Sequence, residues 1–245
     1  MSRRITHADV PAGVRAVAAD LADPASLRDA LAGASQLFLL IAGEDPEGIL
    51  ARARAAGVRR VVLLSSQGAG TRPDLYRQAV SFETAVAGSG LDWTILRSGG
   101  MDSNAFAWAE PIRTQRMAAA PFGDVGLPFV DPDDVAAVAA TVLRSGDHKG
   151  ATYVLTGPAP TTPRERAAAI AEAIGEPVQF IEQTRQEAHE QMSAFMPLPV
   201  VEGTLSILGE PTQEERQVSP GVPRLLGRPA TSFAAWAKRH TAAFR

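Results

Sequence analysis

The sequence predicts an α/β protein with a parallel sheet, and three observations support this class. Short β-branched or leucine-rich runs alternate with alanine-rich stretches of helical length along most of the 245 residues. The run 61–64 is apolar at every position, as a strand buried on both faces requires. An oxygen-bearing residue precedes proline at four expected helix starts, where it caps the helix and proline presets the first φ: 23–24, 45–46, 131–132 and 162–163.

Five strands and four helices follow from this alternation. The expected strands are Val14–Ala18, Gln36–Ile41, Arg60–Leu64, Trp93–Arg97 and Thr152–Leu155. The expected helices between them cover about 24–32, 46–56, 74–88 and 132–145. Asp134, Glu165 and Glu187 each stand three residues after a capping residue, so we interpret them as capping-box residues rather than catalytic acids.

The alternation stops after Gly157, where a proline-rich connection begins. We therefore predict a core over 1–157 and a small, mainly helical region over 158–245 that completes the same globular unit. The expected elements of this region are helices 163–174, 185–195, 199–209 and 232–243 and a strand Val178–Glu182. Four prolines and little periodicity predict a loop over 210–229.

The composition excludes several classes of function. With 24 Lys+Arg against 27 Asp+Glu the net charge is −3, so we expect no direct contact with nucleic acid. Cysteine is absent, which excludes thiol nucleophiles and Cys-ligated metals and is compatible with a reducing cytoplasm. The longest apolar run, 37–42, is far too short to span a membrane, and the four histidines lack metal-ligand spacing. We therefore expect a cytoplasmic protein with no membrane insertion and no metal site.

Several separated motifs occur in one order along nearly the whole chain. They are Asp20-Leu-Ala-Asp-Pro24, Val58-Arg-Arg-Val-Val-Leu-Leu-Ser-Ser66, Gly90-Leu-Asp-Trp-Thr-Ile-Leu-Arg97, Pro121-Phe-Gly-Asp124, Phe129–Ala137 and Tyr153-Val-Leu-Thr-Gly-Pro158. In this combination the sequence resembles the NmrA-like, NAD(P)H-binding atypical short-chain dehydrogenases. The resemblance implies a Rossmann-like parallel sheet with helices on both faces, a small-molecule substrate, and NADP or NAD as cofactor.

The resemblance also implies where ligands bind, because ligands of open α/β sheets lie beyond the carboxyl ends of the strands. The expected cofactor-binding residues are Arg4, Ile41, Ala42, Gly43, Ser65, Gln67 and Arg97. The expected substrate-pocket residues are Gly99, Gly100, Met101, Asn104, Trp108 and Met192. Met192 forms an apolar stripe with Phe195 and Met196 that suits either a pocket lid or core packing.

The opening segment of the family has no counterpart in this sequence. The family begins with a strand, a glycine-rich turn and a helix, whereas this sequence begins near the family's later basic segment, so we expect an N-terminally truncated fold. The glycine turn gives backbone N–H groups to the cofactor diphosphate. Losing two or three such hydrogen bonds costs roughly 4–6 kcal/mol, or about 10³–10⁴ in affinity. We therefore expect weak cofactor binding, with no bound cofactor as the alternative, and we interpret Gly68-Ala-Gly70 as an ordinary loop.

Tyr76 and Ser66 are the candidate catalytic residues. In typical short-chain dehydrogenases a lysine four residues after the tyrosine lowers the pKa of the phenol, but Val80 stands at that position here. A phenol with an ordinary pKa of about 10 is a weak acid–base group at neutral pH. The Ser66 hydroxyl suits a hydrogen bond either to a substrate carbonyl or to loop backbone. Glu83, on roughly the same helix face as Tyr76, is expected to be solvated.

Three functions remain open at this point. The first, by resemblance, is NAD(P)H-dependent reduction of a quinone or small carbonyl compound. The second is a non-catalytic ligand-sensing or redox-sensing regulator, and the third is a cofactor-independent isomerase or cyclase that uses the retained pocket. Without the family's first two strands, Val14–Ala18 would pair directly with Gln36–Ile41 and leave an exposed edge, so we also expect a homodimer.

Overall fold

The computed structural model describes residues 4–245, which form two compact units. The first unit contains the residues up to Ser65 together with Arg77–Leu96 and Val142–Tyr153. The second contains Ser66–Tyr76, Arg97–Thr141 and Val154–Arg245. The expected division at residue 157 stays a prediction. Within 4–245, no helix combines the length and the apolar composition that a membrane crossing requires.

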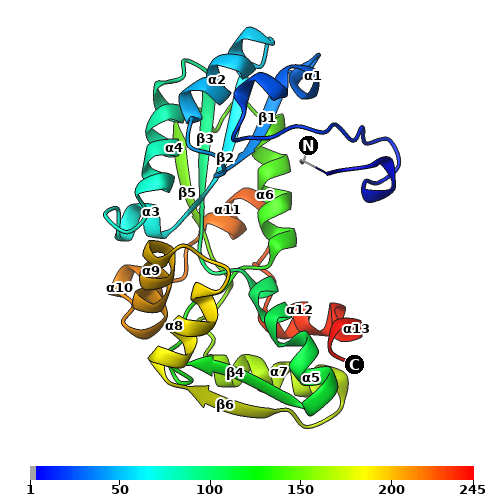
Figure 1. Cartoon of the computed structure of the whole chain (residues 1–245), viewed down its shortest axis with the longest axis vertical. Helices are drawn as coiled ribbons and strands as arrows, with labels where there is room; N and C mark the ends of the chain where they lie inside the picture. The colour runs from blue at the N-terminus through cyan, green and yellow to red at the C-terminus, as the bar shows by residue number, and fades with distance from the viewer. Residues whose placement is uncertain (1–3) are drawn as a thin grey trace. The chain divides into compact units, whose positions relative to one another are not determined.

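A four-stranded sheet with the order β1-β2-β3-β5 carries the α/β architecture (Figure 1). Its strands are β1 (Gln36–Leu40), β2 (Arg60–Ser66), β3 (Asp92–Ser98) and β5 (Ala151–Leu155). β1 and β2 run parallel, with Gln36 beside Arg60 and Leu40 beside Leu64. Four of the five expected strands therefore form at the predicted places, and β2 continues through Ser66. The predicted fold class, a Rossmann-like parallel sheet with helices, is confirmed.

The prediction of a strand over Val14–Ala18 is wrong. Only Ala18 takes part in a β-bridge there, and Val14 is 51% exposed. β1 has β2 as its one neighbour in the order of the described strands, so the expected pairing with Gln36–Ile41 does not form. A strand needs a partner for its backbone N–H and C=O groups, and an apolar pattern alone does not supply one.

Two helices of the first unit begin where their capping residues predict. Asp23 accepts a hydrogen bond from the N–H of Ala25 at the start of η2 (Pro24–Leu27), and Asp45 accepts one from Gly48 at the start of α2 (Pro46–Ala55). η2 continues into α1 (Arg28–Leu31), and α4 covers Arg77–Gly88. α2 and α4 lie side by side in Figure 1, and the buried Phe82 of α4 belongs to the core cluster of this unit.

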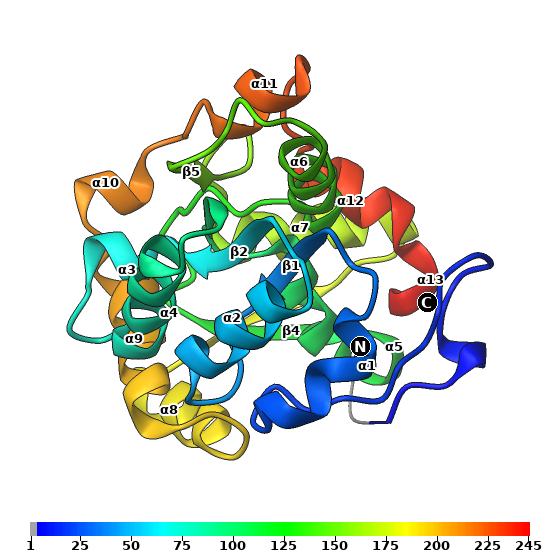
Figure 2. The same cartoon turned by 90° about the horizontal axis from the view of Figure 1, so that it is seen from above.

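The second unit holds a separate two-stranded parallel sheet, β4 (Met117–Pro121) with β6 (Gln179–Gln183). The sequence pattern predicts β6 but not β4, because the centre of β4 is a run of alanines without a β-branched residue. α7 (Pro163–Ile174) packs against α12 (Phe233–Arg239) (Figure 2). Ile170 of α7 and Trp236 of α12 are buried in the same core cluster. The mainly helical C-terminal region is confirmed.

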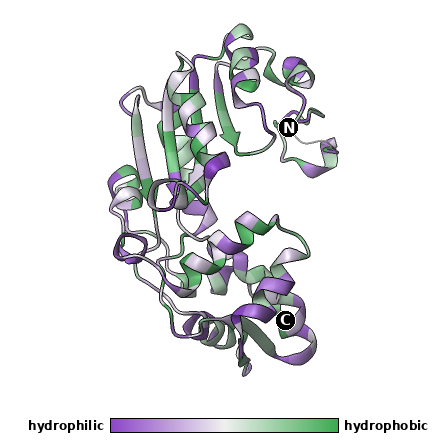
Figure 3. Ribbon diagram, turned by 60° about the vertical axis from the view of Figure 1, so that its left-hand side comes forward, coloured by the Kyte–Doolittle hydropathy of each residue, from purple (hydrophilic) through white to green (hydrophobic). Residues whose placement is uncertain are grey.

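The other helices are mostly short. They are η1 (His7–Asp9), α3 (Gly68–Thr71), η3 (Asp102–Trp108), α5 (Ala109–Gln115), α6 (Pro132–Arg144), α8 (Arg185–Ser193), α9 (Leu198–Gly209), α10 (Gln213–Arg216), α11 (Gly221–Leu226) and α13 (Thr241–Phe244). Many helices carry both hydrophobic and hydrophilic colours in Figure 3, as covering helices with one buried face do. The expected loop 210–229 is wrong in part, because α10 and α11 lie in it. Both are too short for a periodic pattern to mark them.

The capping boxes are confirmed at two of the three expected places. Glu165 and Glu187 each accept a hydrogen bond from the backbone N–H of the capping threonine three residues earlier. Asp134 does something else, because its carboxylate accepts hydrogen bonds from Arg228 Nη2 and Thr231 N, both at 2.6 Å. Both partners lie far along the chain, which is why the local spacing could not predict them.

Candidate functional site

A cavity of about 520 Å³ lies within the second unit. The ends of two strands form part of its wall: Ser66 and Gln67 at β2, and Gly99 and Gly100 after β3. This is the edge at which parallel sheets bind ligands. Side chains from η3, α8 and α9 form much of the remaining wall.

The cavity brings together both candidate catalytic residues and most of the expected substrate residues. Those that line it are Ser66, Tyr76, Gly99, Gly100, Asn104, Trp108 and Met192, with Gln67 from the expected cofactor set. Phe195 and Met196 line it as well, so the apolar stripe of α8 and its following turn borders the cavity.

The other expected site residues do not line the cavity. Met101 forms a β-bridge with Val130, and the guanidinium of Arg97 lies against Gly70. The remaining expected cofactor residues belong to the first unit: Arg4, Ile41, Ala42, Gly43 and Ser65.

Glu83 is buried rather than solvated, so that expectation is wrong. Its side chain accepts a hydrogen bond from Ser65 Oγ at 2.6 Å, and the residue is only 8% exposed. Ser65, near the end of β2, supplies a donor that makes burial of a carboxyl group tolerable. Helix periodicity alone could not predict a partner from another element.

The Tyr76 hydroxyl lies in the cavity wall with Ser66 and Thr204, and hydrogen bonding by these two side chains lowers the pKa of the phenol only slightly. Burial, followed by the nearby Glu215 carboxylate, raises the pKa of Tyr76 above its ordinary value. Arg72 opposes this shift without reversing it. The phenol therefore stays protonated at neutral pH and suits a role as hydrogen-bond donor rather than base.

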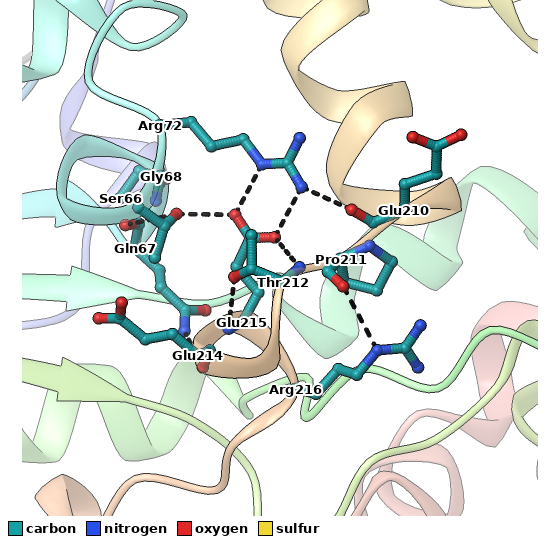
Figure 4. Close-up of polar contacts among 11 residues, drawn as sticks. Ser66, Gln67, Gly68, Arg72, Glu210, Pro211, Thr212, Glu214, Glu215 and Arg216 are labelled. Atoms are coloured by element: carbon teal, nitrogen blue, oxygen red, sulfur yellow. Dashed lines mark hydrogen bonds and ion pairs between the residues drawn. The ribbon is translucent and has the colours of Figure 1, made fainter.

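Glu215 ties α10 to the segment that follows β2 (Figure 4). Its carboxylate is nearly inaccessible and accepts hydrogen bonds from Thr71 Oγ1 at 2.7 Å and from Arg72 Nε and Nη2 at 2.8 and 2.9 Å. The N–H of Thr212 adds another at 2.8 Å. Burial by itself raises the pKa of Glu215, but these hydrogen bonds outweigh it and hold the pKa below the ordinary value.

Two of three buried aspartates near the cavity have a basic partner. Asp131 pairs with Arg239, and Asp134 pairs with Arg228. Asp102 lines the cavity, is fully buried, and has no hydrogen-bond partner for either carboxyl oxygen among the described residues. Burial, and then the Asp131 carboxylate, raises the pKa of Asp102 from 3.8 to about 7.

Arg166 is a second buried, charged residue in the cavity wall. Its guanidinium stacks on the ring of Phe129, 3.7 Å from the ring centroid, and its Nε has no hydrogen-bond partner in the described chain. Burial lowers the pKa of Arg166 to about 10, and Asp102 opposes that shift.

No sequence motif marks Arg166 or Thr204. Glu215 stands three residues after Thr212, so its capping box could have been read from the sequence, but its pairing with Arg72 could not. Asp102 follows the end of β3, where ligand-binding residues are expected.

The described glycine turns at the strand ends do not fit a cofactor diphosphate. A diphosphate needs free backbone amides and open space above the glycine. The amides of Gly68, Gly70 and Gly99 already donate to Ser66 Oγ, Gln67 O and Leu155 O. The space that a Cβ would take is filled at Gly43, Gly68 and Gly70 by Leu21, Tyr76 and Arg97. The cavity has room for a planar ring, but these turns offer no diphosphate cradle.

Comparison with known proteins places the chain in a family. A family model described as NAD(P)H-binding matches residues 1–146. The chain belongs to this NAD(P)H-binding family.

Two proteins with similar sequences are named as reductases. The chain is 37% identical over 240 residues to (4-alkanoyl-5-oxo-2,5-dihydrofuran-3-yl)methyl phosphate reductase of Streptomyces griseus, covering 95% of this chain and 85% of that protein. It is 31% identical over 243 residues to NAD(P)H azoreductase of Xenophilus azovorans, covering 95% and 84%. An NADPH-dependent quinone oxidoreductase from Escherichia coli, solved in complex with NADPH, matches with a TM-score of 0.74 and 26% identity, covering 91% of this chain and 82% of that one.

Replacing Glu215 by alanine should destabilise the protein by about 2–3 kcal/mol, because the partly buried Arg72 and the Thr71 hydroxyl would lose their charged acceptor. Urea unfolding monitored by circular dichroism measures the change. Glu214→Ala is the matched control, since its exposed side chain should change the free energy of unfolding by no more than about 0.5 kcal/mol. Equal unfolding midpoints for the two variants would contradict the role given to Glu215.

Asp102 should make the protein less stable as pH rises. Its pKa is higher in the folded than in the unfolded chain, so the folded state loses stability between the unfolded value of 3.8 and the folded value of about 7. Asp102→Asn removes this titration, so the variant does not lose this stability as the pH rises. The free energy of unfolding of the variant minus that of the unchanged protein should therefore be about 2–3 kcal/mol larger at pH 8 than at pH 5. Urea unfolding of both proteins at the two pH values measures the difference, and a constant difference would contradict the assignment.

Proposed function

We propose that this protein takes part in the NAD(P)H-dependent reduction of a quinone or small carbonyl compound, and that the cavity of the second unit binds that compound. The observation that carries the proposal is the Tyr76 hydroxyl, which lies with Ser66 and Thr204 in the wall of this cavity and has a raised pKa. The names of the relatives support the same reaction class, because each is a reductase or an oxidoreductase.

The residues of the chain itself would bind and orient the substrate. Trp108 donates its indole N–H to the Ala119 carbonyl at 2.8 Å, which fixes one wall of the cavity. Met192 and Met196 provide an adaptable apolar wall that excludes water. Tyr76 holds a proton within the cavity wall, available to an oxygen that gains negative charge during reduction. The hydride itself would come from a nicotinamide cofactor.

A second function, ligand binding without turnover, is favoured by one observation. The amides of Gly68, Gly70 and Gly99 are already used within the chain, so these turns provide no diphosphate cradle. A protein that binds a planar ligand in the same cavity but holds the dinucleotide weakly would act as a sensor rather than as an enzyme. Cofactor affinity separates the two functions.

Titration with NADPH and NADH tests the reductase. The proposal expects submillimolar binding of at least one dinucleotide by calorimetry, together with oxidation of that dinucleotide when a quinone such as menadione is added. Menadione binding with millimolar or weaker dinucleotide affinity and no turnover would contradict the reductase and support the ligand-binding function.

Removing the phenol hydroxyl should lower the rate of reduction. Tyr76→Phe should reduce kcat/KM for menadione by about 10²–10⁴ if the hydroxyl supplies the proton. Tyr153→Phe is the matched control, because the other tyrosine of the chain pairs with His148 at 3.0 Å and does not line the cavity. Equal kcat/KM for the two variants would exclude Tyr76 as the proton donor.

A further inference from the structure

The segment that joins α8 to α9, and the start of α9 itself, are apolar and exposed. Residues 194–201 carry no charged or hydrogen-bonding side chain. Within this run Phe195, Leu198 and Val200 are 72%, 59% and 42% exposed. Single exposed apolar side chains are ordinary, but several that gather in one place mark a binding surface. The run therefore calls for a ligand or partner that covers it.

This exposed run continues the wall of the cavity. Phe195 belongs to both, because it lines the cavity and is also largely exposed. On α9, Thr204 and Leu208 line the cavity, and Val200 precedes Thr204 by about one turn on the same face of the helix. This face of α9 therefore extends from the cavity to the surface of the second unit.

Leu75 extends the apolar surface from a neighbouring segment, and it too is exposed. A Cβ added at Gly203 of α9 would lie 3.5 Å from Leu75 Cβ and 3.4 Å from the ring of Tyr76. Val200 precedes Gly203 by three residues, so it lies on the face of α9 that packs against Leu75 and Tyr76. Tyr76, in the cavity wall, and Leu75, at the surface, thus lie along one helix face.

The cavity offers polar groups at the strand ends and apolar groups toward α9. Ser66 and Gln67 line it at the end of β2, whereas Ile207 and Leu208 line it from α9. Its volume of about 520 Å³ is in the range of pockets that hold drug-sized ligands. A two-ring quinone is smaller than such a ligand and leaves space for a substituent. A ligand with a polar head and an apolar tail matches this arrangement.

We propose that the carbonyl compound bound in the cavity carries a flexible apolar chain, alkyl or isoprenoid, which leaves the cavity over an apolar rim. This rim consists of Leu75, Phe195, Leu198 and Val200. The head group, a quinone or small carbonyl compound, rests on the function proposed above. The rim residues determine specificity, because they remove the chain from water in proportion to the apolar area that is buried. A charged chain end gains nothing from a rim without charged side chains.

A series of menadione derivatives tests the chain in the absence of any dinucleotide. Menadione has no chain, and 3-hexylmenadione adds six carbons to the same ring system. Affinity is measured by quenching of tryptophan fluorescence, since Trp108 lines the cavity. It should rise about twofold for each carbon, roughly half the free energy of full burial, because the rim covers one side of the chain. The hexyl derivative should therefore bind about sixtyfold more tightly than menadione.

A derivative with a carboxylate at the end of a chain of the same length is the matched control ligand. It should bind at least about tenfold more weakly than 3-hexylmenadione, because the charged end keeps the chain in water. Equal affinities of menadione and 3-hexylmenadione would overturn the proposal, and so would equal affinities of the hexyl and carboxylate derivatives.

Two variants at the apolar rim separate the chain site from the ring site. Leu198→Ser and Val200→Ser change exposed side chains that do not line the cavity, so menadione affinity should stay within about twofold. Each should reduce the advantage of the hexyl derivative over menadione about three- to fivefold. Val218→Ser, at an exposed valine outside the rim, is the matched control and should keep the full advantage. An unchanged advantage in both rim variants, or an equal loss in Val218→Ser, would overturn the proposal.

Sedimentation of the ligand-free protein tests a second copy of the chain as the occupant of the apolar rim. A dimer at micromolar concentration that Val200→Ser makes monomeric, together with no gain in affinity from the hexyl chain, would assign the rim to self-association and overturn the proposal. Unchanged sedimentation of Val200→Ser, together with the chain-length gain of the unchanged protein, would support it.

Turnover is measured separately on the same proteins with NADPH and NADH. A chain-length effect on binding without turnover would contradict the reductase and leave the chain site intact. Turnover of menadione with equal affinities for menadione and 3-hexylmenadione would overturn the chain site and leave the reductase. Failure of both ligands to bind would overturn both proposals.

Discussion

A carboxylate that is buried in protein needs a cation or several hydrogen-bond donors beside it, and this requirement organises the second unit. Three such carboxylates are paired with arginines, and each pair joins the C-terminal segment to an earlier part of the chain: Arg72 with Glu215, Asp131 with Arg239, and Asp134 with Arg228. The cavity therefore lies in a unit held by ion pairs as well as by its apolar core. Asp102 differs from these three acids, because it is buried in the same unit without a hydrogen-bond partner among the described residues.

The regular part of the fold could be predicted from the sequence because its signals are local. Apolar runs predict β1, β2, β3 and β5, and threonine caps three residues before glutamate predict the starts of α7 and α8. β4 could not be predicted, since its alanines have no strand preference and their conformation depends on β6, far along the chain. Val14–Ala18 is the opposite case: it has the apolar pattern of a strand but does not form one, because it has no partner strand.

The candidate site could be predicted in part for a similar reason. Tyr76, Ser66, Gly99 and Trp108 follow from strand ends and from the family resemblance, and all line the cavity. The remaining features of the site depend on pairs of residues that are far apart in the sequence. The buried carboxyl group of Glu83 has Ser65 as its partner, and the buried carboxylate of Glu215 has Arg72. Such partners carry no fixed spacing in a sequence. Membership of the family therefore does not fix the chemistry of the site, as the occupied amides of Gly68, Gly70 and Gly99 show.

The walls of the cavity differ in stiffness. Trp108 is fixed by its hydrogen bond to Ala119, whereas Met192 and Met196 are unbranched and can change rotamer at little cost. A space with one firm wall and one adjustable wall discriminates poorly between ring systems of similar area. A methyl or chloro substituent on the ring should thus alter affinity less than the removal of a polar atom at its edge.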